Sequence, residues 1–115
     1  MLYQVVRYER GTLDAVFGAL ADPTRRAITR RLAKGPASVT ELAEPFDVTL
    51  PAILKHLAVL ENAGLVAQQK VGRTKYCSLV PERLESAAEW IDGYREFWRA
   101  RFDSLHRYLQ EEQDT

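Results

Sequence analysis

Four basic side chains stand in two places with hardly any acidic neighbours. Lys55 lies in the middle of the segment 50–62, and Lys70, Arg73 and Lys75 surround a glycine further along the chain. Ammonium and guanidinium groups bind phosphate oxygens, and both can also donate hydrogen bonds to the edge of a guanine base. These residue types therefore predict contact with a nucleic acid.

The formal net charge of zero hides an uneven distribution. Residues 25–75 carry nine basic and four acidic side chains, whereas residues 76–115 carry five basic and nine acidic ones. Such a basic middle attracts phosphate while the acidic end keeps the chain in solution. Four of the basic residues belong to the segment 23–32, either as a solvated face or as contacts to a DNA backbone: Arg25, Arg26, Arg30 and Arg31.

Composition limits the class of protein. A chain of 115 residues, 46% hydrophobic and 28% charged, is typical of one globular domain. The single cysteine, Cys77, excludes an internal disulfide and suits the cytoplasm, and no apolar run reaches membrane-spanning length. The two histidines and the cysteine stand far apart, and no glycine-rich phosphate loop is present. We therefore expect neither an enzyme nor a bound cofactor.

The helices that must position Lys55 are marked by local signals. Ser38 and Glu41 form a capping box, which begins a short helix, and residues 46–48 make a turn. Thr49 caps a second helix that ends at Gly64. Apolar residues at helical spacing give this second helix a buried stripe of Ile53, Leu57 and Leu60. Its outward face is small and weakly charged, which suits entry into a DNA major groove, and comprises Thr49, Pro51, Ala52, Lys55, His56, Val59 and Asn62. His56, beside the stripe, either contacts DNA or makes a structural hydrogen bond.

The other three basic residues belong to a predicted β-hairpin. Residues 65–70 and 74–79 alternate in polarity around Val71-Gly72-Arg73, as in two short strands joined by a turn. A basic hairpin directly after such a helix is a wing, which lies along a phosphate backbone or enters the minor groove. The other interpretation is a hairpin tip that serves only solubility.

The two ends of the chain predict a different surface. Thr12 caps a helix through Leu20, Asp22-Pro23 begins the next helix, and residues 1–11 form an arm to which we assign no function. A long helical segment runs from Pro81 to about Gln110, with a bend expected at Gly93. Its many apolar side chains predict pairing with a second copy of the chain, although the segment could instead fold back over its own core. The predicted dimer interface comprises Leu13, Val16, Phe17, Leu84, Ile91, Tyr94, Trp98, Phe102 and Leu105.

With these elements placed, the sequence resembles the ArsR/SmtB family of winged-helix repressors over residues 12–110. The resemblance is carried by LADPTRRAI (20–28), LAKGPASVTELAEPFDV (32–48), LPAILKHLAVLENAGLV (50–66) and Gly72-Arg73. The LAEPFD turn and the aromatic carboxy-terminal helix are similar to the branch without metal sites. The resemblance implies a homodimer that binds a short, imperfectly palindromic operator and blocks transcription, often of its own gene.

Two features depart from the family pattern. Many relatives have serine or another small polar residue at the position of Leu54, so the operator of this chain is expected to differ from theirs. Relatives that sense thiophilic metals carry cysteines in the helix that here spans residues 39–44, and this segment has none. His106 stands near Asp103 but lacks the further ligands that zinc requires. We expect no metal site, and we expect Cys77 to be a small buried hydrophobe.

The sequence thus predicts a mostly α-helical protein with a small β-hairpin (α+β), in a winged helix-turn-helix fold. An arm (1–11) precedes a DNA-binding core (12–80) and a dimerisation helix (81–115). The predicted function is a homodimeric, cytoplasmic, sequence-specific transcriptional repressor, and nothing in the sequence identifies a small-molecule inducer. The alternatives are a winged-helix interaction module that does not bind DNA and a metal-responsive repressor of the same family.

Overall fold

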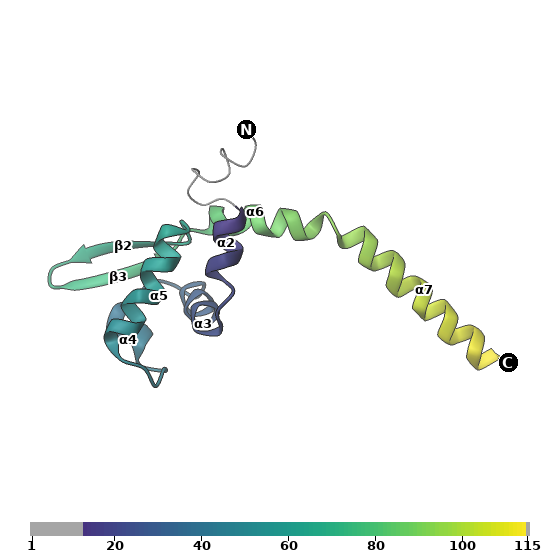
Figure 1. The fold of residues 1–115 in the computed structure, drawn as a ribbon, viewed down its shortest axis with the longest axis horizontal. Helices are drawn as coiled ribbons and strands as arrows, with labels where there is room; N and C mark the ends of the chain where they lie inside the picture. Colours follow the sequence, from purple (N-terminus) through teal and green to yellow (C-terminus); the bar gives the residue numbers. More distant parts are fainter. Residues whose placement is uncertain (1–12, 115) are drawn as a thin grey trace.

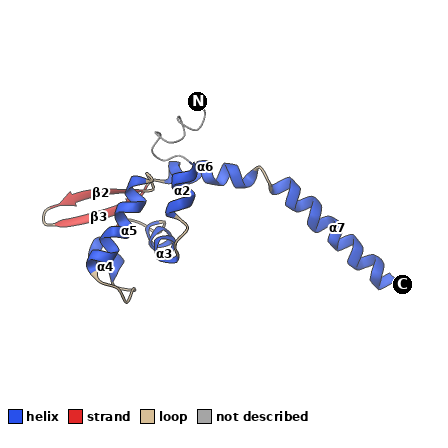
Figure 2. Ribbon diagram, viewed as in Figure 1, coloured by secondary structure: helices blue, strands red, loops and turns tan. Residues whose placement is uncertain are grey.

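A computed structural model describes residues 13–114 (Figure 1). The predicted arm and the capping residue Thr12 lie outside the described residues. Six helices and three strands form within residues 13–114. In chain order they are α2 (Leu13–Ala19), α3 (Pro23–Leu32), β1 (Ala37–Ser38), α4 (Val39–Ala43), α5 (Leu50–Asn62), β2 (Val66–Val71), β3 (Thr74–Leu79), α6 (Pro81–Asp92) and α7 (Arg95–Asp114). The chain is mostly helical with a small antiparallel sheet, as predicted (Figure 2).

Short polar side chains begin three of these helices. Asp22 accepts a hydrogen bond from the backbone N–H of Arg25 at 3.0 Å, and Thr49 accepts one from Ala52 at 3.4 Å. Ser38 and Glu41 complete both halves of the capping box, with distances of 3.1 and 3.2 Å. Each bond satisfies an amide that the first helical turn leaves without a partner. The predicted starts of α3, α4 and α5 are therefore confirmed.

Two glycines with positive φ end α5 and form the turn between β2 and β3. Gly64 has φ = +81°, and its N–H donates to the carbonyl of Glu61 while that of Leu65 donates to Leu60, both at 2.9 Å. This pair of bonds is a Schellman motif, which ends α5 and turns the chain into β2. Gly72 has φ = +64° and forms a two-residue turn with Arg73. A positive φ at the first turn position only is typical of a type II′ hairpin.

The sheet contains one strand that the sequence did not predict. Its strand order is β1-β3-β2, and β1 pairs with β3 through Ala37–Cys77 and Ser38–Tyr76. The predicted hairpin is confirmed, although β2 begins at Val66 and includes Val71, because the turn holds only two residues. β1 thereby connects the start of α4 to the base of the hairpin.

The core lies where the helices α2–α5 meet the base of this sheet. The predicted stripe of α5, Ile53, Leu57 and Leu60, is completely buried. Around it lie the buried side chains of Val16, Ile28, Leu42, Leu65 and Cys77. The position of α5 is thus fixed by one of its faces, which leaves the opposite face at the surface.

The carboxy-terminal segment is two helices rather than one. α6 ends at Asp92, residues 93 and 94 form a turn, and α7 then projects away from the core (Figure 1). The break falls at the glycine where we expected a bend. Every residue from 88 to 113 is exposed, so the alternative of a helix folded back over its own core is wrong.

One residue of the predicted dimer interface needs correction. Val16 has no exposed surface, because it faces the chain's own core rather than a partner. The periodicity of α2 identified an apolar stripe correctly but could not show which surface covers it. The other interface residues on α2, Leu13 and Phe17, are half-buried.

Candidate nucleic-acid interface

The outward face of α5 carries the side chains that we expected to meet DNA. Thr49, Pro51 and Lys55 are exposed, and Ala52 and His56 are half-buried. Lys55 forms no ion pair within residues 13–114, so its ammonium group is available to an external anion. The structure therefore brings these five residues to one side of a helix whose other side is in the core.

Apolar side chains share this face. Leu54 is 43% exposed, and Val59 is also exposed. A leucine cannot donate or accept a hydrogen bond, but it can pack against the methyl group of a thymine.

The wing presents two lysines side by side. Lys70 and Lys75 are direct partners in the pairing of β2 with β3, and Arg73 lies in the turn beyond them. All three are exposed, and none forms an ion pair within the described part of the chain. Like charges opposite each other across two strands repel, so a bound anion would relieve this pair. Figure 1 shows the hairpin extending well beyond the helical core.

Three of the four arginines of α3 bind the protein itself. The side chain of Arg26 donates to the carbonyl of Leu20 at 2.8 Å. Arg31 donates to Gly35 at 3.1 Å and lies 3.7 Å from the carboxylate of Glu41. Arg25 donates to the carbonyls of Gly18 and Ala19. A purely solvated face is therefore wrong for these three, whose bonds fasten α3 to its neighbouring loops and helices.

His56 joins the same network. Its Nδ1 lies 3.3 Å from a terminal nitrogen of Arg25 and 3.9 Å from a carboxylate oxygen of Asp22. The backbone N–H of Arg25 holds the pKa of the Asp22 carboxyl below its ordinary value. The structural hydrogen bond that we considered for His56 is thus present. Sequence reasoning missed its partner, because 31 residues separate Arg25 from His56 and no local pattern links them.

Cys77 is completely buried in β3, as expected. Burial raises the pKa of its thiol, and the negative charge of Glu61 acts in the same direction. The thiol is therefore held in its neutral, weakly nucleophilic form. Within residues 13–114, no group of three or more histidine, cysteine, aspartate or glutamate side chains has the arrangement of a metal site.

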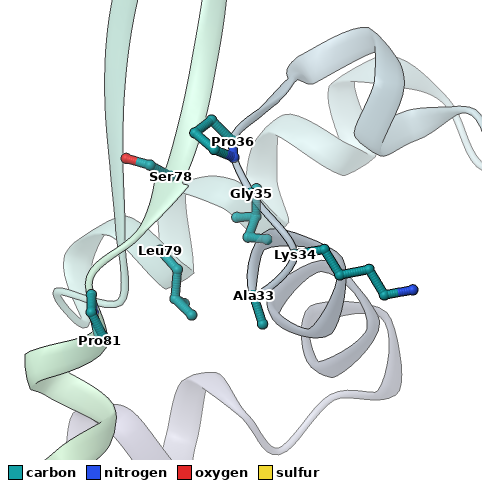
Figure 3. Close-up of a pocket in the computed structure, with 8 residues that line it drawn as sticks. Ala33, Lys34, Gly35, Pro36, Ser78, Leu79 and Pro81 are labelled. Carbon is teal, nitrogen blue, oxygen red and sulfur yellow. The ribbon is translucent and has the colours of Figure 1, made fainter.

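A shallow hollow lies between the end of α3 and the end of β3 (Figure 3). Its volume is about 420 Å³. Its lining is mostly apolar and includes Leu32, Pro36 and Leu79, while the side chain of Lys34 points away from it. It contains none of the candidate DNA contacts and no set of acid, base and nucleophile. No helix among the described residues is long and apolar enough to span a membrane.

Aromatic side chains cover the opposite end of the molecule. Trp98 is 55% exposed and Phe102 is 64% exposed, and Ile91, Tyr94 and Leu105 are also exposed. The rings contact one another along the helices, with centroid distances of 4.9 Å between Trp90 and Tyr94 and 6.2 Å between Trp98 and Phe102. Leu84 is half-buried against the core. These exposed rings form a continuous apolar surface on α6 and α7, which we call the aromatic face: Trp90, Ile91, Tyr94, Phe97, Trp98, Phe102, Leu105, Tyr108 and Leu109.

Comparison with known proteins places this architecture. Residues 20–69 match a family model described as a helix-turn-helix domain. The transcriptional regulator Rv2034 of Mycobacterium tuberculosis is 38% identical over 88% of this chain and 92% of its own length. The transcriptional repressor SdpR of Bacillus subtilis is 33% identical over 69% of this chain and 88% of its own length.

A solved structure supports the same assignment. The crystal structure of an ArsR family transcriptional regulator superposes with a TM-score of 0.70 and 44% identity, covering 76% of this chain and 96% of the other. The chain belongs to the ArsR/SmtB family of winged helix-turn-helix transcriptional regulators.

Proposed function

We propose that two copies of this chain bind one DNA duplex in the cytoplasm and repress transcription, including that of the gene that encodes them. Each copy places α5 in a major groove and its wing along the adjacent backbone or minor groove. The two half-sites are related by an imperfect palindrome and lie about one helical turn, roughly 34–36 Å, apart.

One observation supports the DNA-binding part most strongly. The exposed cations of α5 and the wing have no acidic partner within residues 13–114, and two of them face each other across the hairpin. Such an arrangement is electrostatically unfavourable for the free protein and favourable against phosphate. Thr49, Pro51, Ala52, Lys55 and His56 are the proposed groove contacts, and Lys70, Arg73 and Lys75 the proposed backbone contacts.

The aromatic face supports the dimer. Soluble monomers rarely expose contiguous apolar surfaces of this kind, and tryptophan and tyrosine are common at interface centres. In a two-fold dimer the same surface pairs with itself, so one face satisfies both copies. The proposed interface is carried mainly by Ile91, Tyr94, Trp98, Phe102 and Leu105, with contributions from Leu13, Phe17 and Leu84.

Selection of bound fragments from random duplex DNA tests the proposal. We expect a recovered sequence with two-fold symmetry and an affinity that falls steeply with salt. Lys55→Ala should weaken binding and relax discrimination at one position in each half-site. Arg73→Ala should weaken binding evenly and lower the salt slope by about 0.9 per lost phosphate contact, or about 2 for the dimer. Wild-type affinity and slope in both variants would contradict the assignment.

Lys34→Ala is the matched control. It removes the same charge from an exposed loop after α3, outside both proposed contact regions. We expect its affinity for the selected DNA to equal that of the wild type. A loss as large as that of Arg73→Ala would mean that net charge, rather than contact geometry, governs binding.

A second function is favoured by the apolar part of the α5 face. Leu54 and Val59 are exposed there, as they would be in an interaction module that binds another protein instead of DNA. The two functions differ in a gel-shift at two salt concentrations. The interaction module predicts no sequence-selective complex that weakens as salt rises.

A further inference from the structure

The side chain of Arg25 connects two helices that flank it. Its Nε donates to the carbonyl of Ala19 at 2.6 Å, and one terminal nitrogen donates to that of Gly18 at 3.3 Å. Both carbonyls belong to the last turn of α2, where a cation is favoured by the helix dipole. The other terminal nitrogen lies 3.3 Å from Nδ1 of His56 on α5. One guanidinium therefore fixes the end of α2 to the proposed recognition helix.

The chemistry of the Arg25–His56 contact specifies the tautomer of the imidazole. A guanidinium has only N–H donors and stays charged at all accessible pH values. The ring nitrogen opposite it must therefore accept, which leaves Nδ1 of neutral His56 without a proton. The proton then resides on Nε2, and Nε2–H becomes a hydrogen-bond donor.

The carboxylate of Asp22 does not compete with Arg25 for Nδ1 of His56. The nearest oxygen of Asp22 is 3.9 Å from Nδ1, beyond hydrogen-bond distance, and the same oxygen already accepts from the backbone N–H of Arg25. Asp22 thus holds the first turn of α3, and Arg25 holds the ring.

Nε2 has no acceptor within residues 13–114. The side chain of His56 is 24% exposed, and helical spacing places it next to Ala52 on the outward face of α5. A donor at this place faces whatever α5 binds. Phosphate oxygens and the purine N7 are acceptors of the kind that Nε2–H would meet on DNA.

We propose that Arg25 is a positioning residue for DNA binding, which acts by holding His56 as the neutral Nε2–H tautomer and so aiming one donor at an acceptor on the duplex. This inference rests on the proposed function for its ligand, but its first half concerns the free protein alone. Arg25 itself contacts no DNA in this account.

Long-range ¹H–¹⁵N correlation spectra of the ¹⁵N-labelled free chain test the first half. The spectra are recorded at a pH about two units above the reference imidazole pKa of about 6.5, which favours neutral rings. His106, exposed on α7, is the internal control, and a His106→Gln variant assigns its signals. We expect His56 to show a single Nε2–H tautomer, and Arg25→Met to shift it towards the tautomer mixture of His106. A protonated Nδ1 in the wild type, or the same populations for His56 and His106, would overturn the proposal.

Binding of the selected duplex by His56 variants tests the second half. The side-chain amide of His56→Gln can place an N–H near the position of Nε2–H, whereas His56→Leu cannot donate at all. We expect the leucine variant to bind about tenfold more weakly for each of the two half-sites, the effect of losing one hydrogen bond to a charged or polar acceptor per copy, and the glutamine variant to recover most of that loss. Equal affinity of the two variants would overturn the role of the donor.

The two tests separate this inference from the proposed function. If wild-type protein binds no DNA while His56 shows the single tautomer, the proposed function fails and the role of Arg25 in holding the ring stands. If wild-type protein binds DNA and the tautomers are mixed, the inference fails alone. If Arg25→Met does not fold, the comparison of His56 with His106 in the wild type decides the first half.

Discussion

The winged core and the projecting helix α7 carry similar apolar residues but differ in whether these residues are buried. Among residues 13–114, all the buried apolar side chains lie between residues 16 and 87, where helices and sheet cover one another. Residues 88–113 carry as many large apolar groups, and all of them are exposed. The core is therefore covered within one chain, whereas the apolar side chains of α7 are left uncovered among the described residues. Apolar periodicity identifies a face that needs covering, but only the arrangement of the whole chain shows whether the chain itself covers it.

The largest effect should come from removing a central ring of the aromatic face. We expect Trp98→Ala to raise the dissociation constant of the dimer by about 1000-fold, because a two-fold interface loses the side chain twice and each loss is of hot-spot size. Sedimentation equilibrium over a range of concentrations measures this change. Arg107→Ala, on the opposite side of α7, is the control. If Trp98→Ala dimerises like the wild type, the aromatic face is not the interface.

A substitution in the core should lower the stability of the monomer, which the loss of an exposed ring should not. Leu57→Ala removes a completely buried side chain of α5, and we expect it to lower the free energy of unfolding by about 2–5 kcal/mol. Urea denaturation at protein concentrations where the chain is monomeric measures it. Trp98→Ala should leave this monomer stability nearly unchanged. If both variants lost a similar amount of unfolding free energy, Trp98 would belong to the core of the monomer and the distinction between the two regions would be wrong.

These two regions also show what the sequence could and could not predict. Residues 38, 41, 49 and 64 predicted the helix boundaries well, because capping bonds and a positive φ depend on neighbours only a few positions away. The tip glycine and the alternation of polarity likewise predicted the hairpin.

The missed features all depend on residues far apart in the chain. β1 has two residues, too few to show alternation, and it exists because Ala37 meets Cys77. The contact of Arg25 with His56 is of the same kind. Val16 was placed in the correct apolar stripe but given the wrong partner, since periodicity does not say what lies opposite.

A smaller effect is expected where α5 passes into the hairpin. Gly64→Ala should lower the free energy of unfolding by about 1–2 kcal/mol, because φ is +81° and the new Cβ would lie 3.1 Å from the side chain of Arg83. Gly18→Ala is the matched control: nothing lies within 4 Å of its added Cβ, and alanine favours a helix. Thermal unfolding of both variants should therefore show opposite shifts in Tm.

The smallest expected effect is on thermal stability at acidic pH. The pKa of the Asp22 carboxyl is lowered by the backbone N–H of Arg25, so its contribution to stability is present above the ordinary value of 3.8 and is lost as the pH falls through the lower, folded-state value. The difference in Tm between the wild type and Asp22→Ala should shrink as the pH falls from this ordinary value through the lower, folded-state value. A difference that grows as the pH falls would contradict this sign.

The central claim is that two copies of the chain, joined through their aromatic faces, bind one duplex together. Native mass spectrometry of the protein with the selected duplex measures this directly. The account predicts two chains per duplex, and a complex of Trp98→Ala that forms only at much higher protein concentration. A single chain on the duplex, bound with the full affinity and sequence preference of the wild type, would contradict it.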